Sequence, residues 1–166
     1  MNYLVYIILI SILIVGRAFA CYSVSDELKP SAEQLVGKSK NIFLAEVTNI
    51  SSAMKNIKGS KTFYSFKIIE VLKGSSKSTI QIAASYAENI ESDFDMHKKK
   101  EFWTDNSFGR VNITPACEIL PSFSIGKRYL LFPDEPFTFK SFELIETEKD
   151  MFLSKVRELL KKKNKK

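Results

Sequence analysis

Two cysteines are the residues of this chain whose type and position favour specific chemistry. Cys21 follows Ala18-Phe19-Ala20, a small-x-small pattern typical of a signal-peptide cleavage site, so cleavage there would make Cys21 the first residue of the mature protein. Cys117 is the only other cysteine. A cysteine at a new amino terminus can accept a lipid anchor, form a disulfide bond, or offer its free α-amine to a metal. Acylation would exclude the metal.

The segment before Cys21 has the features of a signal peptide. Residues 4–15 read LVYIILISILIV, an apolar run that is too short to span a bilayer and suits a signal-peptide core. We therefore expect residues 1–20 to be removed and the protein to be secreted into an extracellular or periplasmic space. Disulfide bonds persist in such compartments, and a bridge between Cys21 and Cys117 would contribute about 4.7 kcal/mol through loop-closure entropy.

The charge of the chain is concentrated at its end. The sequence holds 25 basic and 19 acidic residues, and five of the lysines lie in the basic tail at 161–166, KKKNKK. Residues 21–160 hold 19 basic and 19 acidic residues. A nucleic-acid groove would interleave basic and aromatic residues along strands, and that pattern is missing from the sequence. We expect no nucleic-acid partner.

The sequence has few residues suited to catalysis. Its single histidine, His97, precedes three lysines in a predicted loop, where we expect it to be exposed and without a role. A histidine zinc site needs further ligands, and a Ser or Cys triad needs a histidine beside its nucleophile. The sequence has neither a glycine-rich phosphate loop nor an HExxH helix. We therefore expect neither an enzyme nor an intrinsic cofactor.

The pattern of apolar and β-branched residues predicts a mainly β domain over 21–160. The predicted strands are 41–50, 62–72, 78–84, 127–132 and 137–146. Because no long helix separates them, they should pair antiparallel. Five strands with flanking α-helices in one small exported domain favour a closed Greek-key barrel, the OB-fold.

Two helices should flank the strands. A short helix is predicted at 31–36, ended by Gly37. A C-terminal amphipathic helix should begin after a cap at Thr147, with Asp150 three residues on. Its apolar stripe consists of Met151, Phe152, Val156, Leu159 and Leu160.

Residues 86–116 form a long insertion loop without a clear hydrophobic period. The segment contains several aromatic residues, among them Phe102 and Trp103. A connection of this length inside a small domain is usually functional or disordered, and the aromatic content argues against disorder. The segment could extend the contact surface for a partner, with Phe102 and Trp103 as anchors, or it could block that surface.

Several phrases of the sequence occur together in one known family. Cys21 is followed by YSFKIIEVLKG at 64–74, by Cys117, and then by SFSIGKRYLLF at 122–132. This arrangement resembles the amino-terminal domain of the tissue inhibitors of metalloproteinases, the TIMP-like or netrin-like module. The resemblance implies an OB barrel with flanking helices and a disulfide between Cys21 and Cys117.

The resemblance also implies a mechanism and a set of contact residues. The α-amine and carbonyl oxygen of Cys21 would chelate the catalytic zinc of a target protease, and Tyr22 would enter its specificity pocket. Ser23, Pro115 and Ala116 would complete the partner-binding surface. The sequence departs from the family in having Ser23 where a second cysteine is usual, and in lacking the other bridges and the carboxy-terminal domain.

The residues alone leave a second function open. The chain could be a non-inhibitory binding module of the cell envelope, lipid-anchored at Cys21, that recognises protein or glycan on its barrel. In either case we expect a monomer with a protein partner or an extended ligand. Membrane attachment is expected only if Cys21 is acylated or the leader is retained.

Overall fold

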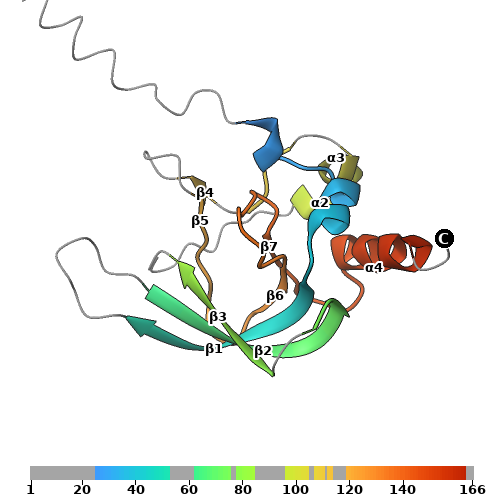
Figure 1. The fold of residues 1–166 in the computed structure, drawn as a ribbon. Helices are drawn as coiled ribbons and strands as arrows, with labels where there is room; N and C mark the ends of the chain where they lie inside the picture. Colours follow the sequence, from blue (N-terminus) through green and yellow to red (C-terminus); the bar gives the residue numbers. More distant parts are fainter. Residues whose placement is uncertain are drawn as a thin grey trace, which may run out of the picture.

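One antiparallel sheet of five strands organises the computed structural model of the chain (Figure 1). The structure describes residues 25–52, 62–75, 78–84, 96–104, 107–110, 112–113 and 119–163. The strands of the sheet are β1 (Ile42–Ser52), β2 (Thr62–Lys73), β3 (Thr79–Ala84), β6 (Arg128–Leu131) and β7 (Phe142–Leu144). They lie in the order β3-β2-β1-β6-β7, and every neighbouring pair is antiparallel. A separate two-stranded ribbon pairs β4 (Asn112–Ile113) with β5 (Ile119–Leu120).

The predicted mainly β, antiparallel fold is confirmed. The sheet is open over the described residues, with β3 at one edge and β7 at the other. The strand predicted at 137–146 is much shorter than expected, because a turn occupies its first half. In that turn the Ser141 amide donates to the Thr138 carbonyl at 3.1 Å, and the Thr138 amide donates to the Ser141 hydroxyl at 2.8 Å.

Helices cover one side of the sheet, where α2 (Ala32–Lys38), α3 (Lys100–Thr104) and α4 (Met151–Lys163) lie together (Figure 1). Two 3₁₀ turns, η1 (Asp26–Leu28) and η2 (Met96–Lys98), precede α2 and α3. Thus part of the segment predicted as an insertion loop at 86–116 is helical. The first three residues of the predicted basic tail, Lys161–Lys163, belong to α4. Within the described part of the chain, no helix is long and apolar enough to cross a membrane.

The ends of two helices differ from the sequence predictions. α2 continues through Gly37 to Lys38, because Ser39 caps it by donating its amide and its hydroxyl to the Leu35 carbonyl. The start of α4 is capped by Asp150 and not by Thr147. The Asp150 carboxylate accepts hydrogen bonds from the amides of Phe152 and Leu153 at 2.9 and 3.0 Å.

Strand β1 separates two hydrophobic cores, because alternate side chains of a strand point to opposite faces. The helix-side core lies between the sheet and the helices; it contains Ala32, Leu35, Val36, Ile42, Leu44, Phe102, Leu130, Phe132, Ile145, Phe152, Leu153 and Val156. The aromatic core fills the other face; it contains Phe43, Ala45, Val47, Tyr64, Phe66, Ile82, Ala84, Phe123, Tyr129, Leu131 and Phe142. Of the predicted stripe on the last helix, Phe152 and Val156 are buried, Leu159 and Leu160 pack against the core, and Met151 is exposed.

Candidate functional site

The residues predicted to contact a protease lie outside the described part of the chain. Cys21, Tyr22 and Ser23 precede Ser25, the first described residue. Pro115, Ala116 and Cys117 lie in the segment 114–118, which is also outside the described residues. The disulfide, the zinc-chelating amine and the contact surface therefore remain predictions. Their neighbours in the sequence are described, and they show where the two segments leave the fold.

The segment that follows Cys21 and the segment that leads to Cys117 meet at one loop. The Phe139 amide donates to the Leu28 carbonyl at 3.0 Å. The ring of Phe108 packs edge-on against Phe139, with 4.7 Å between ring centroids, and the Lys29 ammonium lies 5.5 Å from the Phe108 ring. Leu28, seven residues after Cys21, and Phe108, nine residues before Cys117, thus contact the same residue, Phe139.

Arg110 fixes the second of these segments. Its backbone amide donates to Oε1 of Glu143 at 3.0 Å, and its guanidinium donates to the carbonyls of Phe142 and Ser122. The guanidinium also lies 4.9 Å from the Tyr129 ring, a favourable cation–π distance. Residues 110 and 122, which lie before and after Cys117 in the sequence, are therefore joined to each other by a hydrogen bond.

A buried cluster of charged residues joins the remaining part of the long connection to the sheet and to α4. Nε2 of His97 lies 3.0 Å from Oδ2 of Asp150, and Nδ1 lies 3.3 Å from Oε2 of Glu143 without the alignment of a hydrogen bond. All three residues are buried. Burial alone lowers the pKa of His97, but the two carboxylates outweigh it and raise that pKa to about 9.

The expectation that His97 is exposed and without a role is therefore wrong. Its protonated ring is a structural cation held between two acids, and its burial keeps it away from any ligand. The pKa of Asp150 is raised by burial but lowered more strongly by the His97 contact and the helix amides, so it lies below its usual value. These contacts join the long connection to β7 and to the start of α4.

The predicted anchors of the long connection also have structural roles. Phe102 is completely buried in the helix-side core, so the prediction that it contacts a partner is wrong. The Phe102 carbonyl and the Pro30 carbonyl accept hydrogen bonds from the buried Lys140 ammonium, at 2.7 and 2.9 Å. Trp103 is half-buried and donates its indole N–H to the His97 carbonyl at 2.8 Å. Among the described aromatic residues of this connection, Phe108 is the most exposed, at about half.

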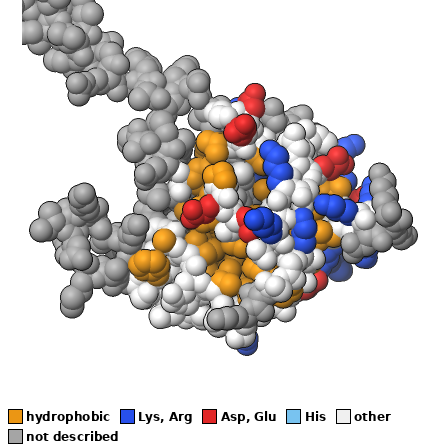
Figure 2. All heavy atoms as spheres, in the orientation of Figure 1, with side chains coloured by type: hydrophobic (Ala, Val, Ile, Leu, Met, Phe, Trp, Pro, Cys, Tyr) orange, Lys and Arg blue, Asp and Glu red, His pale blue; other side chains and the backbone are white. Residues whose placement is uncertain are grey.

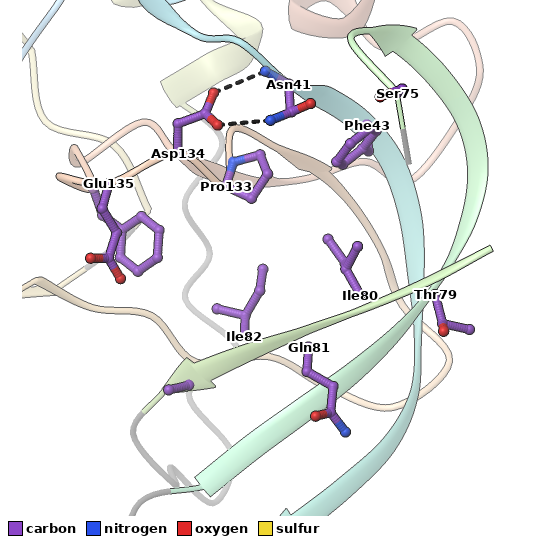
Figure 3. Close-up of a pocket in the computed structure, with 12 residues that line it drawn as sticks. Asn41, Phe43, Ser75, Thr79, Ile80, Gln81, Ile82, Pro133, Asp134 and Glu135 are labelled. Carbon is purple, nitrogen blue, oxygen red and sulfur yellow. Dashed lines mark hydrogen bonds between the residues drawn. The ribbon is translucent and has the colours of Figure 1, made fainter. Parts of the chain in front are cut away.

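A groove of about 500 Å³ lies beside β3 (Figure 3). One wall consists of consecutive residues of β3, Thr79 to Ala83, and the facing wall is formed by Pro133, Asp134, Glu135 and Phe137. Consecutive residues line a cavity when the cavity lies at the edge of a strand, because a face would expose every second residue. The groove therefore lies at the free edge of the sheet.

The polar end of this groove is rigid. The Asp134 carboxylate accepts hydrogen bonds from the amides of Lys40 and Asn41 at 2.6 and 2.9 Å, and from the side-chain amide of Asn41 at 2.9 Å (Figure 3). Burial raises the pKa of Asp134, but these hydrogen bonds outweigh it and lower the pKa below its usual value. The groove thus keeps a fixed negative charge at neutral pH.

Sequence reasoning missed this groove. The alternation of Thr79 to Ala83 predicts a strand, and Pro133 to Pro136 reads as a turn, but nothing in either segment indicates that they face each other. Among the described residues, no group of three His, Cys, Asp or Glu side chains is arranged to hold a metal ion.

Comparison with known proteins adds no relative to this picture. No protein-family model matches the chain, and none of the curated proteins matches it either. The functional assignment therefore depends on the residues and on the geometry described above.

Proposed function

We propose that this chain is an exported inhibitor of a zinc metallopeptidase that acts through Cys21. The observation that carries the proposal is the meeting of the two cysteine-bearing segments at Phe139, through Leu28 on one side and Phe108 on the other. Cys21 lies four residues before Ser25, and each residue extends the chain by up to about 3.5 Å, so the amino-terminal segment can reach roughly 14 Å from Ser25 toward Cys117.

The proposed chemistry needs a free amino terminus. An α-amine has a pKa of roughly 7.7–8.0, so it loses its proton readily beside a zinc ion and can bind together with the Cys21 carbonyl oxygen. A bridge to Cys117 would hold this pair in place before binding, which lowers the entropy lost in the complex. Tyr22 would then select targets with a deep pocket, because its ring would clash with a shallow one.

The strand order supports an OB-like topology for the domain. The first four strands of the five-stranded sheet, in sequence order, are β1, β2, β3 and β6, and they lie side by side in the order 3-2-1-4, read from β3 to β6. This is the Greek-key order, in which the fourth strand returns beside the first. We propose that the domain is an OB barrel that is open between β3 and the residues before β7, as five-stranded OB barrels are often partly open.

Phe108 extends the proposed contact surface. It is half exposed, it packs against Phe139, and it lies beside Lys29 on the side from which both cysteine-bearing segments leave. Aromatic residues with a fixed ring are frequent anchors of protein interfaces. We propose Phe108, in place of Phe102 and Trp103, as the aromatic contact next to Pro115 and Ala116.

Inhibition assays with an extended amino terminus test the proposal. The mature protein beginning at Cys21 is assayed against a panel of zinc metallopeptidases, beside a variant with one alanine added before Cys21. The matched control carries one alanine after Lys166. We expect inhibition by the mature protein and by the control, and its loss in the amino-terminal extension. Equal inhibition by all three proteins would rule out chelation by the amine.

A second candidate function is a binding module of the cell envelope, anchored by a lipid on Cys21. The groove at the edge of β3 favours it, because its described lining contains neither Phe108 nor Phe139, so it offers a second surface for a ligand. A lipid-anchored protein should partition into detergent and lose that partitioning in Cys21→Ser. A wild-type protein that stays in the aqueous phase would exclude the anchor.

A further inference from the structure

We propose that the groove beside β3 binds an extended peptide, which adds to the sheet as a further strand. The peptide would place an apolar side chain against Ile80 and Ile82 and a basic side chain beside Glu135. This site is independent of Cys21, and it holds whether or not the chain inhibits a metallopeptidase.

The backbone of β3 presents hydrogen-bonding groups to the groove. The Ser78 carbonyl accepts a hydrogen bond from the Ile68 amide of β2 at 2.9 Å, so the backbone groups of Ser78 point toward β2. In a strand these groups alternate in direction, so those of Thr79, Gln81 and Ala83 point away from β2 into the groove. No strand of the described residues pairs with this edge. A free edge of this kind is a template for an added strand.

The facing wall is unsuited to closing the sheet by itself. Pro133 and Pro136 have no N–H group, so this segment cannot supply a regular ladder of donors to β3. The space between the two walls, about 500 Å³, lies in the range of known ligand sites. An extended backbone can enter this space and donate and accept hydrogen bonds along β3.

The apolar floor of the groove selects the side chains of the peptide. Ile80 and Ile82 point into the groove from β3, while Gln81 points away from it (Figure 3). Phe43 and Phe137 complete the apolar lining. Hydrophobic side chains are visible in the middle of this face of the molecule (Figure 2). Alternate residues of an added strand face the same way, so every second residue of the peptide should be apolar.

The charge at one end of the groove determines which peptide side chain is favoured there. Glu135 is exposed, and the neighbouring Asp134 carboxylate is held in its charged form by Asn41 and Lys40. The Lys40 side chain acts electrostatically on Asp134, so exposed Glu135 is the acid left for a ligand at this end, and other lysine and arginine side chains gather over the side formed by α2 and α4 (Figure 2). The nearby Lys73 ammonium is engaged by backbone carbonyls, among them that of Val36 at 2.8 Å. A basic side chain of the peptide is therefore favoured at the Glu135 end.

Backbone methylation of a synthetic peptide tests strand addition directly. The probe is a fluorescently labelled, end-capped heptapeptide of alternating valine and threonine with one terminal lysine, and binding is followed by fluorescence anisotropy. Two methylated versions are compared, one with N-methyl groups on the valines and one with N-methyl groups on the threonines. Methylation should weaken binding only in the version whose methylated N–H groups face β3. That version should lose about tenfold or more in affinity because those hydrogen bonds are missing. Equal affinities of the two versions, or no binding of the parent peptide, would overturn the proposal.

Variants of the protein locate the site. Gln81→Pro removes an N–H group that points into the groove and leaves the backbone pairing with β2 intact, although it also removes the exposed 3.3 Å hydrogen bond from the Gln81 side chain to the Ser65 hydroxyl. It should therefore weaken binding while the far-ultraviolet circular dichroism spectrum stays unchanged. Glu135→Gln should reduce the preference for the lysine peptide over its glutamate counterpart, whereas Glu33→Gln, on the exposed face of α2, should not. If Gln81→Pro fails to fold, Glu135→Gln and the methylated peptides still decide the question.

A second copy of the chain is the competing occupant of this edge. Light scattering after gel filtration distinguishes a second copy from a peptide as the occupant. Pairing of β3 with β3 would give a dimer that Gln81→Pro converts to a monomer. The proposal expects a wild-type monomer. A dimer that dissociates in this variant and excludes the peptide would assign the edge to self-association.

Discussion

The imidazole of His97 and the carboxylate of Asp150 are 3.0 Å apart in the interior of the domain, although 53 residues separate them in the sequence. Asp150 is at the same time the amino-terminal cap of α4, and Glu143 contacts the other ring nitrogen from β7. One protonated ring therefore joins the long connection, the edge of the sheet and the last helix. Four predictions for folding follow from this contact and its surroundings.

Stability should fall at alkaline pH because His97 loses its proton. Its pKa is about 9 in the fold against 6.5 in the unfolded chain, so its contribution is complete below pH 6.5 and is lost as the pH rises through 9. The loss should be about 3 kcal/mol. We expect the difference in free energy of unfolding between wild type and His97→Gln, measured in urea, to shrink by this amount between pH 6 and pH 10. Parallel curves for the two proteins would contradict the contact.

The cap of α4 should depend on Asp150 and not on Thr147. Asp150→Ala removes two helix hydrogen bonds and the partner of a buried cation, so it should cost more than about 2 kcal/mol. Asp150→Asn keeps an oxygen for the amides but loses the charge, and its cost should be intermediate. Thr147→Ala, at an exposed residue, should stay within about 0.5 kcal/mol. Thermal unfolding of the three variants checks the order, and a larger effect of Thr147→Ala would be inconsistent with the capping geometry.

Two glycines should respond in opposite directions to alanine. A methyl group at Gly109 would lie 2.6 Å from the Glu143 carboxylate and closer still to the Phe139 carbonyl, so Gly109→Ala should destabilise strongly. A methyl group at Gly37 would meet no atom within 4 Å. Because Gly37 lies inside α2, Gly37→Ala should stabilise by about 0.5–1 kcal/mol. Measuring the free energy of unfolding of both variants tests these opposite effects. A destabilised Gly37→Ala would mean that α2 ends at residue 37.

The aromatic core should depend on Phe123. Its ring lies edge-on to those of Tyr64, Phe66, Tyr129 and Phe142, with centroids 4.9–5.4 Å apart. Phe123→Ala should cost about 3–5 kcal/mol through lost contacts and a cavity. Ile125→Ala, at a residue that is 60% exposed two positions later, should change stability by less than about 0.5 kcal/mol. Similar costs for the two variants would argue against this packing.

Local patterns predicted much of the sheet. The apolar run at Ile42 to Val47 indicates a strand, and this strand is buried on both faces because it separates two cores. The alternation from Phe137 onward predicts a strand too early. Lys140 lies in that stretch and is buried, with its ammonium bound to two carbonyls of other segments, so a turn replaces the first part of the strand. Such tertiary contacts leave no trace in a local hydrophobic period.

The candidate sites were less predictable for the same reason. His97, beside three lysines, has the sequence environment of a surface residue, and its acidic partners come from β7 and from the start of α4. The groove combines β3 with a proline-containing segment about fifty residues later. In both cases the residues meet only when the sheet and the helices assemble. Cys21 lies outside the described residues, so its role after the cleavage pattern stays a prediction.

The state of the mature amino terminus tests the central claim most directly. Intact mass and amino-terminal sequencing of the secreted protein, before and after reduction, report the first residue, any lipid and the disulfide in one experiment. The account predicts a chain that begins at Cys21 with a free amine, and a mass that rises on reduction by the hydrogen atoms of one disulfide bond. A retained leader, or an acylated Cys21, would contradict the proposed inhibitor.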